Sequence, residues 1–393
     1  MEPRSNRWLW VLLTNVSLAQ ASIYVMRPMI TYRALENGAT GYQIGLIAAL
    51  YALVPLVVAV QMGRWVGKFG EVPLLVLGCA SFIVLALGFA FLNNVIAIAA
   101  TTSLAGIAHL SNVAASQSMV ASRSPNQDQD RNFGYFSFAT SSGHTFGPIL
   151  GGLIAGSSGV LPRSSSSAFV FAAILALVAL VPLLIFRGLH QARSDSERER
   201  AEQIRAREVM ARPGIKPAVW TSLAVSATND VLVVILPLVG TENKISPVVI
   251  GTILSLRSAA AMISRFSLGK LTSIFGSSRV LNVSILFATI FLTLTVFAKS
   301  ATTLGVLMIL VGLLLGIGQP LTMSMVSKKS PIEERAMAIS LRLSGNRLGQ
   351  FLVPIGSGTM AGFFGSGSIF LGLALLIGSA GVVSVAADRS PSA

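Results

Sequence analysis

The chain has 393 residues, of which 53% are hydrophobic and only 11% are charged. Soluble proteins carry about 25% charged residues, and the mean hydropathy here is +0.73, so the composition excludes an ordinary soluble protein. The net charge of +14 comes mostly from basic residues between apolar runs, which indicates a membrane surface rather than nucleic acid as the partner. Cys79 is the only cysteine, which excludes an intrachain disulfide and a cysteine-based zinc site.

Hydropathy predicts twelve membrane-spanning helices, because each long apolar run approaches the ~20 residues that cross a bilayer core. Alternating segments of about ten residues, typical of membrane barrels, are absent from the sequence. The first six spans are expected at 8–31, 43–65, 72–93, 95–121, 133–156 and 167–187. The last six are expected at 217–240, 247–268, 279–298, 301–326, 336–361 and 363–387. The predicted fold class is an all-α membrane protein.

The N-terminus has features of a secretory signal peptide. Arg4 and Arg7 precede an apolar run, and Ala19-Gln20-Ala21 follows as a small-residue site. We expect no cleavage, because the repeat described below requires this segment as its first helix.

A polar segment, residues 187–216, separates the two halves and contains RSDSERERAEQIRAREVM. Ser194 followed by Glu197 is a capping-box pattern, and alternating Glu and Arg at helical spacing favour a short surface helix. The predicted organisation is therefore a first bundle at 1–187, a cytoplasmic linker at 188–216 and a second bundle at 217–393.

Lys and Arg are concentrated on one side of the predicted membrane. That side holds Arg4, Arg7, Arg64, Lys68, Arg123, Arg131, the linker, Lys270, Arg279, Lys328, Lys329, Arg335 and Arg389. The opposite side holds little beyond Arg33, Arg163, Lys244 and Lys299. Because positively charged loops stay in the cytoplasm, both termini are expected on the inner side of a bacterial cytoplasmic membrane.

The halves repeat each other at an offset of 206 residues. Gly45 and Gly63 bracket one span, and Gly251 and Gly269 bracket its counterpart. The same offset relates Ile44, Ile47, Leu50, Phe69, Gly70 and Ser124-Pro125 to Ile250, Ile253, Leu256, Phe275, Gly276 and Ser330-Pro331. Parallel repeats of six spans predict two pseudo-symmetric six-helix bundles, with a site near mid-bilayer between them.

The fifth expected span contains GHTFGPILGG, with Gly143, Gly147 and Gly151 on one helical face. Small residues on one face allow another helix to approach closely, and Pro148 can kink the helix. This pattern suits a helix between moving halves, and plain tight packing is the alternative interpretation.

This stretch resembles a known signature. Gly143, Gly147, Pro148, Gly151 and Gly152 are similar to the antiporter motif G-x-x-x-G-P-x-x-G-G in the fifth helix of the major facilitator superfamily. Chain length, twelve spans, the six-plus-six repeat and the long central loop resemble the same superfamily. The resemblance implies the major facilitator fold and the drug:proton antiporter branch, which exports small molecules against proton entry.

The loop after the second span, GRWVGKFG, resembles the loop signature of the same superfamily in part. Gly63, Lys68 and Gly70 fit the signature, whereas Gly67 occupies the position of its acid and Glu71 that of a base. The loop 269–276, GKLTSIFG, is equally partial. The arginine usual in the fourth helix, which the family ties to proton coupling, is also missing. The resemblance therefore implies that coupling uses other groups.

Asp230 is the only acid placed deep in an expected span. Asp230 and Arg257 each lie about ten residues from the outer ends of their spans, or ~15 Å deep. A charge at mid-bilayer costs from ~2.5 to more than 10 kcal/mol unless it is paired or faces water. We therefore expect Asp230 and Arg257 to pair, with the neighbouring Asn229 in the same site.

Arg347 is a second deep cation, beside Asn346 in the eleventh expected span. Two deep arginines against one aspartate indicate a missing anion, which a substrate carboxylate or phosphate could supply. The alternative is that backbone carbonyls or phenolic groups satisfy Arg347. Arg342 and Arg265 are expected to snorkel toward the cytoplasm.

His109 and His144 lie near the middle of the fourth and fifth expected spans. Histidine titrates near physiological pH, so either residue could carry a proton; hydrogen-bonded packing is the alternative. Gln20 and further amides in spans one, four, seven, ten and eleven indicate a polar centre, although contacts between helices explain several of them equally well.

These observations predict a secondary active transporter that moves a small molecule by alternating access, with proton-coupled efflux as the main hypothesis. An importer or exchanger of organic or inorganic anions with an arginine clamp is the alternative, and a membrane sensor or assembly partner is a third class. No catalytic constellation appears, so an enzyme is not expected. The expected partners are a small-molecule substrate, protons and the lipid bilayer, without nucleic acid, metal or cofactor, and the chain is expected to be a monomer.

Overall fold

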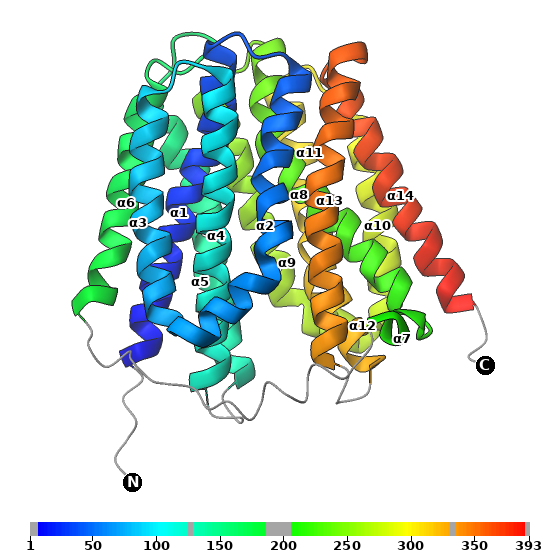
Figure 1. Cartoon of the computed structure of the whole chain (residues 1–393). Coiled ribbons are helices and arrows are strands. Elements are labelled where there is room, and N and C mark those ends of the chain that lie inside the picture. The colour runs from blue at the N-terminus through cyan, green and yellow to red at the C-terminus, as the bar shows by residue number, and fades with distance from the viewer. Residues whose placement is uncertain (1–6, 125–128, 186–205, 331–334, 390–393) are drawn as a thin grey trace. The chain divides into compact units, whose positions relative to one another are not determined.

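The computed structural model describes residues 7–124, 129–185, 206–330 and 335–389. Fourteen helices cover almost all of this described part (Figure 1). They are α1 (Arg7–Glu36), α2 (Gly41–Phe69), α3 (Glu71–Phe91), α4 (Val95–Arg123), α5 (Gln129–Ala155), α6 (Ser165–Ile185), α7 (Ala206–Ala211), α8 (Ile215–Glu242), α9 (Pro247–Phe275), α10 (Ser277–Thr295), α11 (Ala301–Gly316), α12 (Gly318–Lys328), α13 (Arg335–Phe364) and α14 (Gly367–Arg389).

Ten helical segments in the described ranges are long and apolar enough to cross a membrane. Helices α5 and α13 are the two expected spans that fall outside this set, because serines, glycines and charged residues lower their hydropathy. Both still have ample length, with 27 and 30 residues. The tenth expected span is one apolar segment, Ala301–Val326, with a break at Ile317 between α11 and α12. The all-helical membrane fold class is confirmed.

The internal repeat is visible in where the helices begin. Helices α2, α3 and α4 start at residues 41, 71 and 95, and α9, α10 and α11 start at 247, 277 and 301, which is an offset of 206 each time. Gly70 and Gly276 precede α3 and α10 with φ of +85° and +81°. Only glycine adopts such angles without strain, so the two halves make the same turn with the same residue.

The described helices fall into two compact units. The first comprises Met1–Ala39, Val57–Arg193 and Lys244–Ser255, and the second comprises Thr40–Leu56, Ser194–Asn243 and Leu256–Ala393. Helices α2 and α9 thus each contribute a segment to both units. The expected capping box of the linker lies outside the described residues, which begin again with the short α7.

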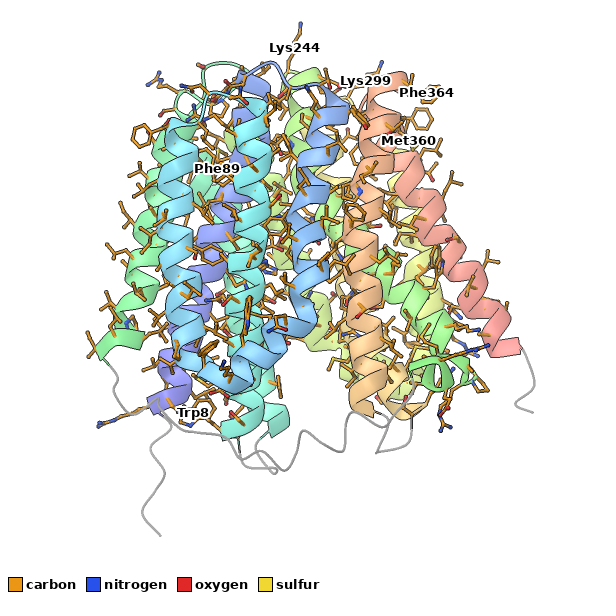
Figure 2. The ribbon with its side chains drawn as sticks, in the orientation of Figure 1. Trp8, Phe89, Lys244, Lys299, Met360 and Phe364 are labelled. Carbon is orange, nitrogen blue, oxygen red and sulfur yellow. The ribbon has the colours of Figure 1, made fainter. Side chains whose placement is uncertain are left out.

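The first unit is built around α1, which packs along α5 and α6, while α3 packs against α4 and α6. Trp8 lies at one end of this unit and Lys244 at the other (Figure 2). The second unit is built around α8, which packs against α12, α13 and α14, with α10 against α14 and α11. Lys299 and Phe364 lie at the same end of this unit (Figure 2).

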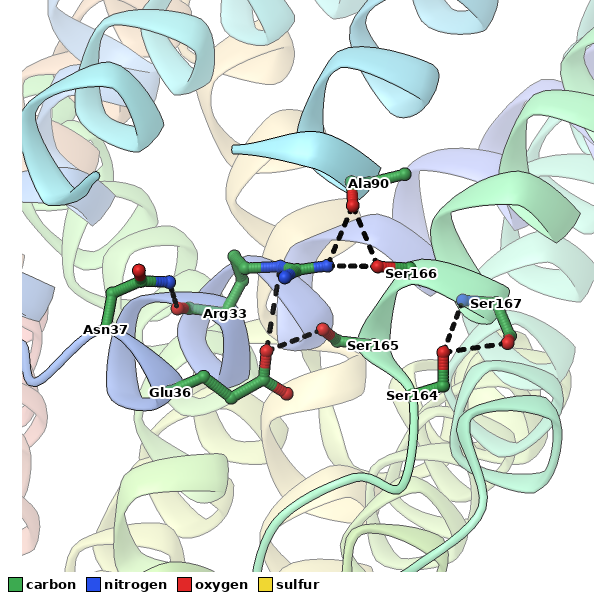
Figure 3. Close-up of polar contacts among 8 residues, drawn as sticks. All are labelled: Arg33, Glu36, Asn37, Ala90, Ser164, Ser165, Ser166 and Ser167. Carbon is green, nitrogen blue, oxygen red and sulfur yellow. Dashed lines mark hydrogen bonds and ion pairs between the residues drawn. The ribbon is translucent and has the colours of Figure 1, made fainter. Parts of the chain in front are cut away.

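A polar clamp ties α1 to α3 and α6 in the first unit (Figure 3). The Nη2 atom of Arg33 donates to the carbonyl of Ala90 at 3.1 Å and to Ser166 Oγ. Glu36 Oε2 lies 3.6 Å from Arg33 Nε and accepts from Ser165 Oγ at 2.8 Å. The Arg33 guanidinium therefore joins one end of α1 to the last turn of α3 and the first turn of α6.

We expect Arg33→Met to destabilise the protein. Hydrogen bonds to a charged group contribute about 1.5–3 kcal/mol, and methionine leaves the Glu36 carboxylate without its cation. The melting temperature in detergent should fall clearly, whereas Arg163→Met, at an exposed site in the same region, should leave it unchanged. Equal melting temperatures for the two variants would contradict a structural role for the clamp.

Candidate functional site

The glycine face of α5 packs directly on α1. A Cβ atom added at Gly143 would lie 2.5 Å from Gln20 Cβ and 2.6 Å from the backbone nitrogen of Ala21. A Cβ atom at Gly147 would lie 2.7 Å from Tyr24 Cβ. These distances leave no room for any side chain, so the spacing of four residues is what lets the two helices touch.

The next turn of α5 meets the first part of α9, which belongs to the same unit. A Cβ atom at Gly152 would lie 2.9 Å from the carbonyl oxygen of Pro247, and one at Gly251 would lie 2.4 Å from that of Pro148. The backbone N–H of Ile149 donates to Ser255 Oγ at 3.0 Å. The antiporter-like stretch is thus packed by backbone against two helices.

A polar cluster lies where α1, α4 and α5 meet. Gln20 Nε2 lies 3.3 Å from His109 Nε2, and Gln20 Oε1 lies 3.3 Å from His144 Nε2. The Tyr24 ring stacks on His144 with 3.9 Å between centroids, and the Arg27 guanidinium lies 5.9 Å from the Tyr24 centroid. Three residues predicted from the sequence are therefore brought together, and Tyr24 and Arg27 join them.

Asn15 and Asn112 belong to a separate buried contact around the single cysteine. The Nδ2 atoms of Asn15 and Asn112 lie 3.2 and 3.7 Å from Cys79 Sγ, and Asn15 Nδ2 also donates to the carbonyl of Ala179 at 2.9 Å. Cys79 is 0% exposed. This contact joins α1, α3, α4 and α6, and it explains two of the amides in the spans by packing.

Glu71, the first residue of α3, contacts α4. Glu71 is buried and accepts from Ser118 Oγ at 3.2 Å and from Ser122 Oγ at 3.1 Å. Burial lowers the pKa of Arg123, and the attraction of Glu71 opposes that shift. Lys68 lies over the ring of its neighbour Phe69, 5.3 Å from the centroid. Glu71, which stands where the signature has a base, thus binds within its own unit.

We expect Glu71→Gln to weaken the contact between α3 and α4. Glutamine keeps the shape but loses the charge that Arg123 meets, and hydrogen bonds to a charged group contribute about 1.5–3 kcal/mol. Thermal unfolding in detergent measures the loss. Glu208→Gln, an exposed acid on α7, is the matched control, and a Glu71 variant as stable as that control would argue against the contact.

A second polar cluster occupies the second unit, between α8, α9, α12 and α13. Arg257 is 5% exposed, and its Nη1 atom donates to Asn229 Oδ1 at 2.7 Å. Asp230 is half-buried and is the next residue of α8. The predicted partners therefore lie on two helices that this hydrogen bond joins, and the Arg257 guanidinium is bound by the residue that precedes the acid.

Polar residues of α13 bind side chains of α8 and α12. Arg342 Nη1 donates to Ser222 Oγ at 2.9 Å and to Gln319 Oε1 at 2.8 Å, and Asn346 Nδ2 donates to the same Gln319 oxygen at 3.2 Å. Arg342 is 5% exposed, so the expectation that it snorkels is wrong. The polar face of α8 supplies partners inside the unit, and a guanidinium with buried partners has no need to reach the interface.

Arg347 is half-buried and continues this polar face. Its Nη1 atom donates to Gln350 Oε1 at 3.0 Å, and Gln350 Nε2 donates to Ser226 Oγ at 3.0 Å. Ser222 and Ser226 were not predicted from the sequence. They precede Asp230 by eight and four residues, and residues four apart lie on the same face of a helix. Tyr24 follows Gln20 by the same step. Helical periodicity from each deep polar residue would have found all three.

Comparison with known proteins agrees with this architecture. The model of the Major Facilitator Superfamily matches residues 12–229 and 218–393. A "Multi-drug resistance efflux pump PmrA homolog" of Lactococcus lactis subsp. lactis (strain IL1403) is 26% identical over 344 residues, covering 85% of this chain and 82% of that protein. The "Quinolone resistance protein NorA" of Staphylococcus aureus is 26% identical over 180 residues, 46% of this chain and 45% of that protein, so this match spans about half of each.

Solved structures show the same fold at low sequence identity. A bacterial homologue of the human lysosomal transporter Spinster, in an inward-facing and occupied conformation, has a TM-score of 0.81 at 15% identity, covering 99% of this chain and 100% of that one. The nucleoside transporter NupG has a TM-score of 0.73 at 13% identity, covering 97% of this chain and 99% of that one.

Proposed function

Because the chain belongs to the major facilitator superfamily and is a multi-pass membrane transporter, we propose that it exports small molecules in exchange for protons by alternating access. The names of the relatives support export, since they are described as efflux and resistance proteins. The observation that supports the proton coupling is Asp230, a half-buried acid that directly follows Asn229, the hydrogen-bond partner of Arg257.

The proposed coupling step is a change of charge at Asp230. In this step an ionised Asp230 attracts the guanidinium of Arg257, which is bound to Asn229, and a proton arriving from outside removes that attraction. Arg257 is then available to other partners, which shifts the balance between outward- and inward-facing states. The exported compound needs only to bind one of the states more tightly to bias the same equilibrium.

The test uses the purified protein in proteoliposomes loaded with a lipophilic cationic dye. An imposed proton gradient should accelerate dye movement against the direction of proton flow, and an ionophore that collapses the gradient should abolish the acceleration. Dye movement that ignores the gradient would remove proton coupling from the proposal. The proposed setting is a bacterial cytoplasmic membrane with both termini inside and a monomeric chain.

An anion importer or exchanger is the second candidate, and the three arginines of the second polar cluster favour it. Arg257, Arg342 and Arg347 bind neutral polar side chains, and the same set of helices carries one aspartate, Asp230. Arginine suits bidentate binding of carboxylate and phosphate. Competition of dye transport by anionic, neutral and cationic solutes separates the candidates. Inhibition confined to anions would favour the arginine clamp over export of cationic compounds.

A further inference from the structure

Gln20 connects two histidines from different helices through the two ends of one amide. Its Nε2 atom lies 3.3 Å from Nε2 of His109 on α4, and its Oε1 atom lies 3.3 Å from Nε2 of His144 on α5. The chain has three histidines, and these two are the only ones in expected spans. The side chain that joins them is itself 3% exposed.

An amide has opposite hydrogen-bonding character at its two ends. The NH₂ group only donates and the oxygen only accepts. With its NH₂ group toward His109, Gln20 donates to His109 Nε2, which must carry a lone pair, and accepts from His144 Nε2, which must carry a proton. Rotating the amide by half a turn reverses both requirements. One ring therefore presents a lone pair to Gln20 whenever the other presents an N–H.

Protonation of the rings follows from this constraint. An imidazolium has an N–H on both nitrogens and no acceptor. A charged His144 fits the present orientation, and a charged His109 fits the rotated one. If both rings were charged, one N–H would face the NH₂ group of Gln20 in either orientation, and two cations would share the same buried cluster.

We infer that His109, Gln20 and His144 form a binding site for a single proton, in which the orientation of the Gln20 amide follows the ring that holds the proton. The inference deepens the proposed function, on which the role of this proton in transport rests. The three residues all belong to the first unit, whereas Asp230 and Arg257 belong to the second.

The surrounding charges also favour one proton over two. Arg27, over the Tyr24 ring that stacks on His144, already places a cation near the cluster. The ring of Phe82 on α3, which is uncharged, lies 6.5 Å from that of His109 between centroids. Helix α6 carries no titratable group in its range, and neither does the segment 247–255 of α9. The remaining titratable groups of the helices packed there are Arg7, Tyr32, Arg33 and Glu36 on α1, Glu71 and Cys79 on α3, Arg123 on α4, and Asp130, Arg131 and Tyr135 on α5.

The experiment counts protons on the histidines of the purified full-length protein in nanodiscs. Nitrogen-15 labelling of histidine resolves each ring by NMR, with His190→Gln to assign the third signal. Between about pH 8 and pH 5, the range in which histidine usually titrates, the pair should take up one proton in total. His109→Gln and His144→Gln should each still take up one, and the double variant none. Two independent sites would take up two protons in the wild type, one in each single variant and none in the double variant. A wild-type count of zero or two therefore overturns the inference.

Removing the connection gives the second arm of the test. Gln20→Met keeps the size of the side chain but neither donates nor accepts, so the hydrogen-bond constraint against a second proton is lost and the count should rise above one. Ser22 lies on the same helix as Gln20 and donates a buried hydrogen bond to the carbonyl of Ala172 on α6. Ser22→Ala removes that bond and should leave the count at one. An unchanged count in Gln20→Met overturns the role of the amide; if that variant does not fold, the counts in the histidine variants decide.

The titration needs no transport, so the two proposals fail separately. A pair that holds one proton in a protein whose transport ignores the proton gradient would support the site and remove the proposed coupling. A pair that takes up two protons in a protein that is driven by the gradient would overturn the site and leave the exporter standing.

Discussion

Gly143→Val is expected to prevent the first unit from packing. The added Cβ atom would lie 2.5 Å from Gln20 Cβ and 2.6 Å from the Ala21 nitrogen, and the latter belongs to the backbone of α1. A backbone atom cannot move aside like the end of a flexible side chain. Overpacking typically costs about 1–3 kcal/mol, and valine adds two methyl groups beyond the Cβ atom, so the loss should reach the upper part of that range.

Gly134→Val is the matched control for this change. Gly134 lies on the same helix, and a Cβ atom there would meet nothing within 4 Å. Size-exclusion chromatography of detergent extracts and the thermal unfolding of the monomeric peak measure both variants. Gly143→Val should yield little folded protein and Gly134→Val a normal amount. Equal yields and melting temperatures would show that α1 and α5 can separate without cost.

Asp230→Asn is expected to abolish the response of transport to a proton gradient. Asparagine preserves the shape and one hydrogen-bonding oxygen but cannot gain or lose a proton. Coupling free energies between linked sites are typically about 1–3 kcal/mol, or roughly 5- to 150-fold, and this is the acceleration that the variant should lose. Exchange of labelled for unlabelled dye without a gradient should persist, because it requires movement of the site but no net proton transfer.

Glu242→Gln provides the control acid on the same helix. Glu242 stands at the end of α8, and its Oε2 atom accepts from the backbone N–H and the hydroxyl of Ser366. Its replacement should change stability slightly and leave the response to the gradient intact. An Asp230→Asn protein that is still driven by protons would exclude Asp230 from coupling and direct attention to the histidines of the first unit.

The fold was predictable because its signals are long and repeated. Runs of apolar residues set the spans, and an offset of 206 recovered from a few glycines reappears in the first residues of three helix pairs. The break at Ile317 was not predictable from hydropathy, because an apolar window continues across it. The signals at α5 and α13 were weaker, since polar residues that serve packing and contacts lower the hydropathy of both helices.

The site was predictable only in part, because a sequence indicates the depth of a residue but not its direction. Gln20, His109 and His144 were identified one by one as deep polar residues, and only the packing of α1 on α4 and α5 shows that one amide reaches both rings. The sequence led us to expect that Arg342 reaches the interface. Its buried partners, Gln319 and Ser222, could not be predicted, because their distance from Arg342 depends on how three helices pack. The role of each residue in transport remains a prediction.

The burial of Cys79 has a practical consequence for spectroscopy. Thiol reagents attack an accessible thiolate, and this sulfur is fully enclosed between α1, α3, α4 and α6, with two asparagine amides against it. A cysteine introduced at an exposed position would therefore take up a maleimide dye or a nitroxide spin label alone. Pairs of such labels can report distances during turnover in the wild-type background, without first removing a native cysteine.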